Sequence, residues 1–208
     1  MDLTGRSDFI ETWLCEMPEG LGKFPTFDTL EYCIKDRIAH GSKPIEIAPN
    51  IKKIIGQQVI YYWIESNNDV VLGTELYIKP QGLIVGLTGK NPKWVGHKPY
   101  ASDLYDIVLK DNNKSLRLFS DNSLSDEGYN IWKRLFNQGH TVSVYDREQP
   151  GKTFTTLYSL DDMDKYFKYD DTDFKRYQYV LSEQNVTLAE TRSYFHIRRH
   201  RELIPGLL

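Results

Sequence analysis

The stretch SDNSLSDEGYNIWKRLFNQGHTVSVYD, residues 120–146, predicts a helix that is followed directly by a strand. Ser125 or Asp126 is suited to cap the helix, because a short polar side chain accepts a hydrogen bond from a free N–H group of the first turn. Gly139 stands where a left-handed residue commonly ends a helix. The alternation of apolar residues in TVSVYD then indicates a strand. The stretch therefore supplies one helix and one strand to a mixed domain.

Upstream of this stretch, the apolar pattern changes from strands to a helix and back to a strand. Three alternating segments with short turns between them predict an antiparallel meander: QQVIYYWIES (57–66), VVLGTELYIK (70–79) and LIVGLTG (83–89). A loop rich in Lys, Pro and Gly, residues 90–99, then leads to a predicted helix in residues 100–111. SLRLFSD, residues 115–121, predicts the next strand.

The two ends of the chain add further elements. Two amphipathic helices are predicted before the meander, one around Phe9–Leu14 and one around Leu30–Ile38. After residue 146 we expect a strand in GKTFTTLYS, a short helix around Asp161–Tyr166 capped at Ser159, a strand in RYQYVLSEQ and a helix in the last residues. The expected organisation is a domain of residues 1–158 and a C-terminal extension of residues 159–208 that packs on it or projects from it.

Composition restricts the class of protein. With 208 residues, 40% of them hydrophobic and 26% charged, the chain is expected to fold as a globular domain. The net charge of −3 argues against nucleic acid or an anionic membrane as a partner. Cys15 and Cys33 are too few for a disulfide framework, and no apolar leader precedes the first helix. A cytoplasmic protein is expected.

This order of elements resembles the fold of the GNAT family of N-acetyltransferases. The likeness runs from Asp8 to about Tyr158. It implies an α/β fold of the α+β type, with a mixed, mainly antiparallel central sheet flanked by helices and with the C-terminal helical extension outside it. In that family the last strand of the meander leads through a pyrophosphate-binding loop into a helix. The resemblance therefore implies that acetyl-CoA binds at residues 90–101.

The loop departs from the family's pattern, which is Arg or Gln, two residues, Gly, one residue, then Gly or Ala. KWVGHK supplies Lys93 and Gly96, but Lys98 stands where the small residue belongs. A second register uses Gly96 and Ala101, with a proline between them that lacks a donor. The resemblance implies that the cofactor-binding residues are Lys93, Gly96, Lys98 and Ala101, within an electropositive mouth that Lys90 and His97 complete. The alternative is a basic loop with a purely structural role.

The helix in residues 126–137 carries the second departure from the family. In the family a tyrosine of this helix donates a proton to the departing thiolate, and Trp132 falls on its position here. An indole N–H does not supply a labile proton as a phenol does. Tyr129, one turn earlier, and Tyr145, on the following strand, are therefore the candidate catalytic residues. Trp132 is expected to pack in the core.

Two functions remain open. The first is an acyltransferase that moves an acetyl group from acetyl-CoA to an amine. The second is a catalytically inactive GNAT-like domain that works in protein interaction or assembly, as a phage virion or host-takeover protein. The style of LSDEGYNIWKRL and VSVYD suggests the phage source. A basic C-terminal segment would contact the partner's carboxylates or phosphates in this case, through Arg192, Arg198, Arg199 and Arg201. His196 and His200 lack the remainder of a zinc motif, and no metal site is expected.

Overall fold

A computed structural model describes residues 27–112, 116–149, 154–168 and 176–181 of the chain. The first predicted helix, Cys15, the C-terminal helix and the four candidate partner arginines lie outside the described residues. In the described part, four α-helices are found: α1 (Phe27–Ala39), α2 (Ala101–Asp111), α3 (Asp126–Asn137) and α4 (Leu160–Lys168). A short 3-10 helix, η2 (Pro92–Trp94), lies between the meander and α2.

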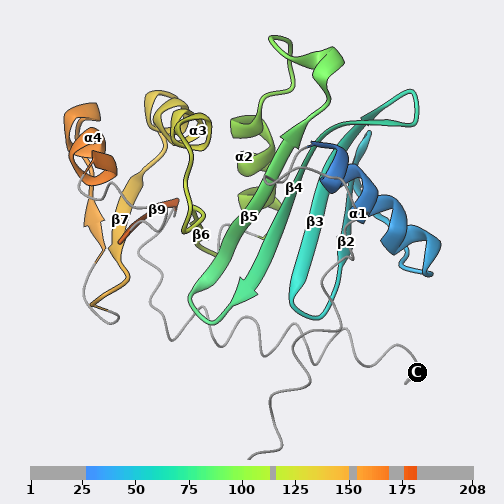
Figure 1. Cartoon of the computed structure of the whole chain (residues 1–208), viewed down its shortest axis with the longest axis horizontal. Coiled ribbons are helices and arrows are strands. Elements are labelled where there is room, and N and C mark those ends of the chain that lie inside the picture. The colour runs from blue at the N-terminus through green and yellow to red at the C-terminus, as the bar shows by residue number, and fades with distance from the viewer. Residues whose placement is uncertain (1–26, 113–115, 150–153, 169–175, 182–208) are drawn as a thin grey trace, which may run out of the picture.

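The described strands form one sheet of nine members, in the spatial order β1-β2-β3-β4-β5-β6-β9-β7-β8 (Figure 1). They are β1 (Ile45–Ala48), β2 (Ile51–Ile55), β3 (Val59–Ser66), β4 (Asp69–Lys79), β5 (Gly82–Lys90), β6 (Leu118–Phe119), β7 (Val142–Asp146), β8 (Thr155–Thr156) and β9 (Tyr177–Leu181). Among these strands, β5 and β6 pair in parallel and all other neighbours pair antiparallel. The mixed, mainly antiparallel sheet flanked by helices is the predicted fold class.

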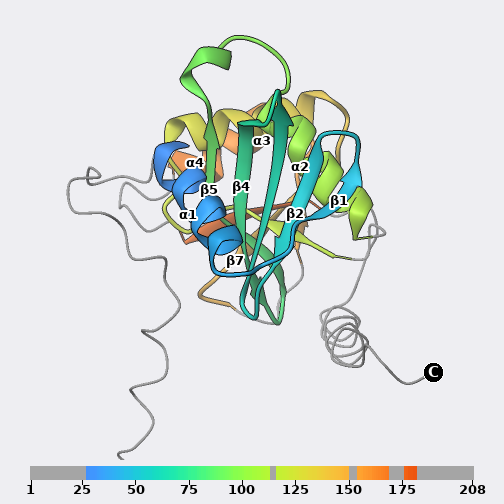
Figure 2. The same cartoon turned by 90° about the vertical axis from the view of Figure 1, so that its right-hand side faces the viewer.

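Helices cover both faces of the sheet, and the strand alternation of β3 shows how (Figure 2). Tyr61 and Trp63 pack with α1 residues such as Leu30 in one apolar cluster. Tyr62, between them in the sequence, points to the opposite face and belongs to the cluster that α2, α3 and α4 cover. Successive side chains of a strand alternate between faces, so this aromatic run is buried on both sides.

The meander predicted from the sequence is confirmed as β3, β4 and β5. The hairpin of β1 and β2 before it was not predicted. Its two strands are short and β2 carries consecutive lysines, so the apolar pattern is weak there. The turn between them depends on Asn50, whose φ of +63° is tolerated by asparagine better than by most residues.

The helix and strand of residues 120–146 form as predicted. Ser125 caps α3, because its side-chain oxygen accepts a hydrogen bond from the N–H of Gly128 at 3.1 Å. Gly139 ends the helix with a φ of +88°, and β7 follows. The short helix near residue 160 is likewise capped as predicted, by Ser159, which accepts a hydrogen bond from the N–H of Asp162 at 3.1 Å.

In the C-terminal half of the sheet the strands were predicted, but their spatial order was not. The strand expected in residues 151–159 is β8, which pairs with β7 at the sheet edge. β9 instead lies between β6 and β7 and pairs antiparallel with both. Its side chains Tyr179 and Leu181 are buried in the main core. The sheet therefore contains strands from the expected domain of residues 1–158 and also β9 from the expected C-terminal extension.

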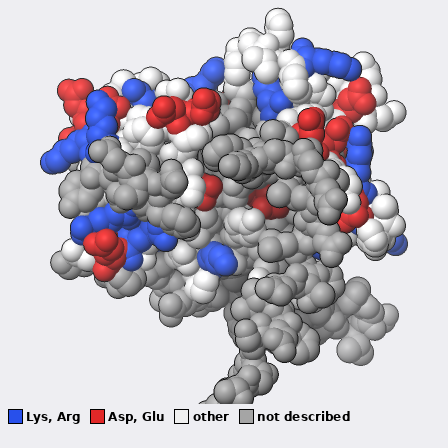
Figure 3. Space-filling model, in the orientation of Figure 1, with Lys and Arg blue, Asp and Glu red and all other residues white. Residues whose placement is uncertain are grey.

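Two further findings concern the surface and the helices. On the face shown in Figure 3, the visible acidic and basic side chains lie interspersed. None of the helices in the described ranges is both long enough and apolar enough to cross a membrane.

Candidate functional site

The parallel strands β5 and β6 part soon after they meet. They pair at Leu83 with Leu118 and at Ile84 with Phe119, whereas β5 continues as far as Lys90. From Val85 onward, therefore, β4 is the one strand among those described that pairs with β5, and the other edge of β5 has no strand partner there. Figure 1 shows α2 and α3 next to each other beside this divergence. Backbone groups of β5 that face the divergence are not used in a strand ladder.

A β-bulge lies in this unpaired half of β5. Glu75 pairs with Leu87 and Leu76 pairs with Val85, so Gly86 is the extra residue. Bulges bend a strand and are common next to active sites. A Cβ atom at position 86 would lie 2.3 Å from Cε2 of Tyr77 and 3.0 Å from Oε1 of Glu75. The glycine therefore lets these two side chains lie directly over the bulge.

Glu75 is oriented by two phenols on the α1 face of the sheet. Tyr61 donates a hydrogen bond to Oε2 of Glu75 at 2.7 Å, and Tyr77 is also hydrogen-bonded to this carboxylate. Burial is the main cause that raises the pKa of both phenols, and Glu75 raises both further. Both hydroxyl groups therefore stay protonated at neutral pH. The arrangement presents a carboxylate with a fixed orientation beside the bulge, where it is able to accept a proton.

Asp121 lies where β6 ends and the two strands have separated. Burial raises the pKa of its carboxyl group, and hydrogen bonds from the backbone of Asn122 and Ser123 partly oppose this effect. Its charge contributes to the raised pKa of Tyr77 and also to that of Tyr105 on α2. Asp121 is therefore electrostatically coupled to the Glu75 side of the site and to α2.

The predicted cofactor-binding residues are placed together before and at the start of α2. Lys93 lies in η2, Lys98 is exposed in the loop, and Ala101 is the first residue of α2. Gly96 has a φ of +83°, and nothing lies within 4 Å of the position that a Cβ atom would take. The loop projects beyond the end of the sheet (Figures 1 and 2). A ligand is therefore able to approach the backbone at Gly96.

Two further cations surround Tyr100, which precedes α2. The guanidinium carbon of Arg134 on α3 lies 3.6 Å from the centre of the Tyr100 ring, and the Lys90 ammonium lies 5.0 Å from it. Lys90 also donates hydrogen bonds to the carbonyl oxygens of His97 and, at 2.8 Å, of Pro99. Burial lowers the pKa of Lys90, the Asp103 charge partly offsets this, and the charge of Arg134 lowers it further. Positive charge therefore gathers at this end of α2.

The residues at this end fit a phosphate-bearing group such as the pyrophosphate of coenzyme A. Helix N-termini favour anions. The Ser102 hydroxyl, in the first turn of α2, is buried and has no hydrogen-bond partner among the described residues. The one acidic side chain of this turn is Asp103, which accepts a hydrogen bond from the N–H of Tyr100 at 2.8 Å. The carboxylate takes one donor that a phosphate would otherwise use, and the basic loop lies beside it.

The two candidate catalytic tyrosines lie on opposite faces of the sheet. Tyr129 is buried in the α2–α3–α4 cluster, donates a hydrogen bond to Oδ1 of Asp164 at 2.7 Å, and stacks on Phe167 at 4.0 Å. Burial, followed by the hydrogen bond to Asp164, raises its pKa. Tyr145 packs edge-on against Phe119 in a separate cluster. The structure does not bring the two hydroxyls together.

Trp132 lies in the core, as its position on α3 predicted. Its side chain is 1% exposed. The ring packs against Tyr105 of α2 and Tyr179 of β9, with a distance of 6.1 Å between ring centres in both cases. Trp132 therefore has a structural role.

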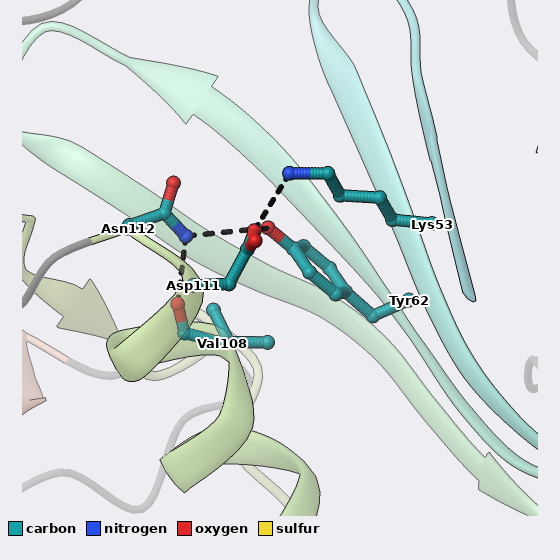
Figure 4. Close-up of polar contacts among 5 residues, drawn as sticks. All are labelled: Lys53, Tyr62, Val108, Asp111 and Asn112. Carbon is teal, nitrogen blue, oxygen red and sulfur yellow. Dashed lines mark hydrogen bonds and ion pairs between the residues drawn. The ribbon is translucent and has the colours of Figure 1, made fainter. Parts of the chain in front are cut away.

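A buried polar network holds the opposite end of α2 (Figure 4). Lys53 on β2 donates to Oδ2 of Asp111 at 2.7 Å, and Tyr62 on β3 donates to the same oxygen at 2.6 Å. The side-chain amide of Asn112 donates to the Tyr62 hydroxyl at 3.2 Å and to the Val108 carbonyl at 2.7 Å. The Lys53 side chain is 6% exposed and that of Asp111 16% exposed. This network fixes the C-terminal end of α2 to the sheet.

Sequence reasoning found the loop but missed Arg134, Glu75 and their partners. The chain is similar to a solved structure from Bacteroides thetaiotaomicron that is assigned as an acetyltransferase of the GNAT family. The sequence identity is 13%, the match covers 72% of this chain and 73% of the other, and the TM-score is 0.29. No model of a known protein family matches the chain, and no curated protein does. A TM-score this low carries no weight for function, so strand topology and side-chain geometry are the grounds for proposing one.

Proposed function

We propose that the domain is a GNAT-type acyltransferase that moves an acetyl group from acetyl-CoA to an amine. The observation that supports this most is the divergence of the parallel strands β5 and β6 after two residue pairs, with a bulge in the unpaired half of β5. The resemblance found in the sequence implies a cofactor at this place in the fold. The basic loop and the start of α2 lie at the end of β5 that the divergence opens.

The cofactor would be held by its phosphates. Lys93, Lys98 and Arg134 supply positive charge, Gly96 allows close approach, and the first turn of α2, from Ala101, supplies N–H groups. When bound, acetyl-CoA supplies the thioester that is attacked. The unpaired backbone of β5 would receive the acyl end, because it lies between the loop and the bulge.

Glu75 is proposed to accept the proton of the incoming amine. Tyr61 and Tyr77 hold its carboxylate beside Gly86. Glu75 would take one proton from the protonated amine and leave a neutral nitrogen. When this nitrogen displaces the thiolate, a C–N bond would form and a C–S bond would break, and the second proton that the nitrogen loses would balance the proton that the thiolate gains. Tyr129 and Tyr145 remain the residues proposed to protonate the departing thiolate, and Tyr129→Phe and Tyr145→Phe test each of them by turnover.

Thermal stabilisation by acetyl-CoA tests cofactor binding. A ligand at a hundred times its Kd contributes about 2.7 kcal/mol to the free energy of unfolding, which raises the Tm. The variant Lys93→Ala/Lys98→Ala should lose this shift and keep the Tm of the free protein. The matched control Lys35→Ala/Lys110→Ala removes two exposed lysines elsewhere and should keep the thermal shift with acetyl-CoA. No shift of the unaltered protein at millimolar acetyl-CoA would contradict the proposal.

Turnover of Glu75→Gln tests the proposed base. Release of free coenzyme A is followed with spermidine, tyramine and a lysine-containing peptide as acceptor probes. We expect Glu75→Gln to lose about 10²- to 10⁴-fold in turnover, the usual contribution of a general base. Its thermal shift with acetyl-CoA should remain. Equal turnover of Glu75→Gln and the unaltered enzyme would assign the base elsewhere.

A second candidate function is a GNAT-like domain without cofactor that acts in assembly, including in a phage virion or host cytoplasm. Two observations favour it. The Lys90 ammonium is bound to carbonyls of its own loop, and Asp103 places a carboxylate at the start of α2. The contacts proposed for a partner are Arg192, Arg198, Arg199 and Arg201, outside the described residues. The acetyl-CoA thermal shift distinguishes this function from the first.

A further inference from the structure

Three hydroxyl groups form a chain that joins α2 to the β5 bulge. The Tyr105 hydroxyl of α2 lies 2.8 Å from Oγ1 of Thr88 on β5, which lies 2.8 Å from Oγ1 of Thr74 on β4. Thr74 in turn donates to the carbonyl oxygen of Leu87 at 3.0 Å. Thr74 and Tyr105 are almost completely buried, at 0% and 2% exposure. The chain thus runs through the core and ends on the residue after Gly86.

Counting protons gives the chain a direction. A hydroxyl group has one proton to donate and accepts through its lone pairs. Because Thr74 gives its proton to the Leu87 carbonyl, Thr88 must donate to Thr74 and Tyr105 must donate to Thr88. Burial raises the pKa of Tyr105, so its phenol keeps the proton that the first link requires. All three protons are therefore used, and the last one is directed at the backbone of β5.

The last link fixes a peptide plane beside the bulge. The carbonyl of Leu87 and the N–H of Thr88 belong to one planar peptide unit, so a hydrogen bond to the carbonyl also restricts the direction of the N–H. Gly86 adds a residue to β5 at this point, and the regular ladder alone does not determine the orientation of the backbone. Apolar side chains would fill the same space without the cost of burying hydroxyls.

We propose that Tyr105, Thr88 and Thr74 are positioning residues that relay the placement of α2 to the bulge of β5. The relay rests on the proposed function. The phosphate end of the cofactor contacts the start of α2, and its acyl end meets the backbone near the bulge. Because Tyr105 belongs to α2, the hydroxyl chain makes the orientation of the β5 backbone at the acyl end depend on the position of α2 at the phosphate end. It acts on the orientation of the reacting groups rather than on their chemistry.

Thr88→Val, which keeps the shape of the side chain and removes the hydroxyl, tests the relay. We expect kcat to fall roughly 10- to 100-fold, because small displacements of reacting groups cost rate, while KM for acetyl-CoA changes little. Thr88→Ser restores the hydroxyl and should recover most of kcat. Tyr105→Phe removes only the first hydroxyl of the chain, and its kcat should lie between those of Thr88→Val and Thr88→Ser. The most responsive acceptor of the three amine probes is used throughout.

Tyr179→Phe is the control for loss of a buried phenol. Its hydroxyl donates to the Met163 carbonyl at 2.6 Å, in the core and outside the relay. It should keep KM for acetyl-CoA, whereas its kcat also reports on the candidate Tyr129, with which the Tyr179 hydroxyl interacts. Amide hydrogen exchange provides a readout that does not need turnover. Thr74→Val, which removes the donor to the Leu87 carbonyl, should accelerate exchange of the backbone amides of Leu87 and Thr88, and Tyr179→Phe should not.

Two negative results have different meanings. In an active enzyme, equal kcat for Thr88→Val and the unaltered enzyme, with unchanged exchange at Leu87 and Thr88 in Thr74→Val, would overturn the relay and leave the proposed function in place. The absence of any acetyl-CoA thermal shift in the unaltered protein would overturn the proposed function and the relay with it.

Discussion

The two ends of α2 differ in how their charges are used. At the C-terminal end, Asp111 is enclosed with Lys53 and Tyr62, and each of the two donates to the same carboxylate oxygen. At the N-terminal end, Arg134 and Lys90 lie against the ring of Tyr100, and the loop residues beside them are exposed. One end is a closed network of groups that satisfy one another, and the other presents positive charge to solvent.

This difference separates a structural role from a binding role. A carboxylate at a helix C-terminus is unfavourable because of the helix dipole, and burial adds to the cost. Asp111 therefore depends on Lys53 and Tyr62 for its stability. At the start of α2 a ligand with phosphates would complement the cations and the dipole together. Substitutions at the C-terminal end should thus affect folding, and those at the N-terminal end should affect binding.

The largest effect is expected at the closed end. Lys53→Met leaves the Asp111 carboxylate buried without its cation, which should lower the free energy of unfolding by about 3–5 kcal/mol. Urea denaturation followed by circular dichroism measures this. Lys52→Met is the matched control, because Lys52 pairs with Glu65 at 2.6 Å with a side chain that is 31% exposed, and it should cost less than about 1 kcal/mol. Similar losses in the two variants would refute the distinction.

A smaller effect is expected from Asp103→Asn at the open end. The amide oxygen still accepts the hydrogen bond from Tyr100, but the favourable charge at the helix start is lost, at a cost of about 0.3–1 kcal/mol. Removal of the same charge should strengthen acetyl-CoA binding, which titration calorimetry measures. Asp106→Asn, next to Lys110 on the same helix, is the control and should leave affinity unchanged. Weaker binding by Asp103→Asn would show that the phosphates bind elsewhere.

Arg134→Ala should lower the free energy of unfolding by no more than about 1 kcal/mol, because its contact with the Tyr100 ring lies at an exposed site. Its acetyl-CoA thermal shift should nevertheless be reduced, since a cation at the open end is lost. Lys133→Ala, the neighbouring residue, interacts with Asp164 at 3.4 Å instead and should retain the shift. An undiminished shift in Arg134→Ala would remove this residue from the site.

The smallest effect is a pH dependence at Asp121, whose charge acts on Tyr105 in the middle of α2. Burial raises its pKa above the ordinary value of 3.8, so the folded state binds its proton more tightly than the unfolded state. Stability is therefore lost as pH rises from 3.8 through the folded pKa. Asp121→Asn should have a higher Tm than the unaltered protein at pH 7 and an equal Tm at about pH 3, below both pKa values. A lower Tm at pH 7 would contradict this assignment.

Local patterns predicted elements whose signals lie close together in the sequence. Ser125 and Gly139 marked the ends of α3, and the alternating residues of β3, β4 and β5 marked the meander, because caps and strand periods involve neighbouring residues. β9 was predicted as a strand, but its place between β6 and β7 was not. Strand neighbours depend on how the whole sheet closes, and no short segment carries that information.

The candidate site shows the same limit. Lys93, Gly96, Lys98 and Ala101 were implied by the resemblance to the family, whose motif is a short run of neighbouring residues. Glu75 meets Tyr61 from a different strand, and Arg134 meets Tyr100 from a different helix. The bulge at Gly86 arises from a shift in the pairing of β4 with β5. The sequence LIVGLTG alone predicts a regular strand. Contacts between distant segments have no local signature.

The sequence by itself determined the described α-helices and all the described strands except the β1–β2 hairpin, where α3 and α4 begin, and that a basic loop precedes α2. Tertiary structure alone decided that β5 and β6 part, that Glu75 lies over the bulge with two phenols, and that Tyr129 and Tyr145 fall on opposite faces of the sheet. The physical reason is the range of the interactions. Backbone capping and periodicity act over a few residues, whereas strand pairing, burial and charge contacts join residues that the folded chain brings together.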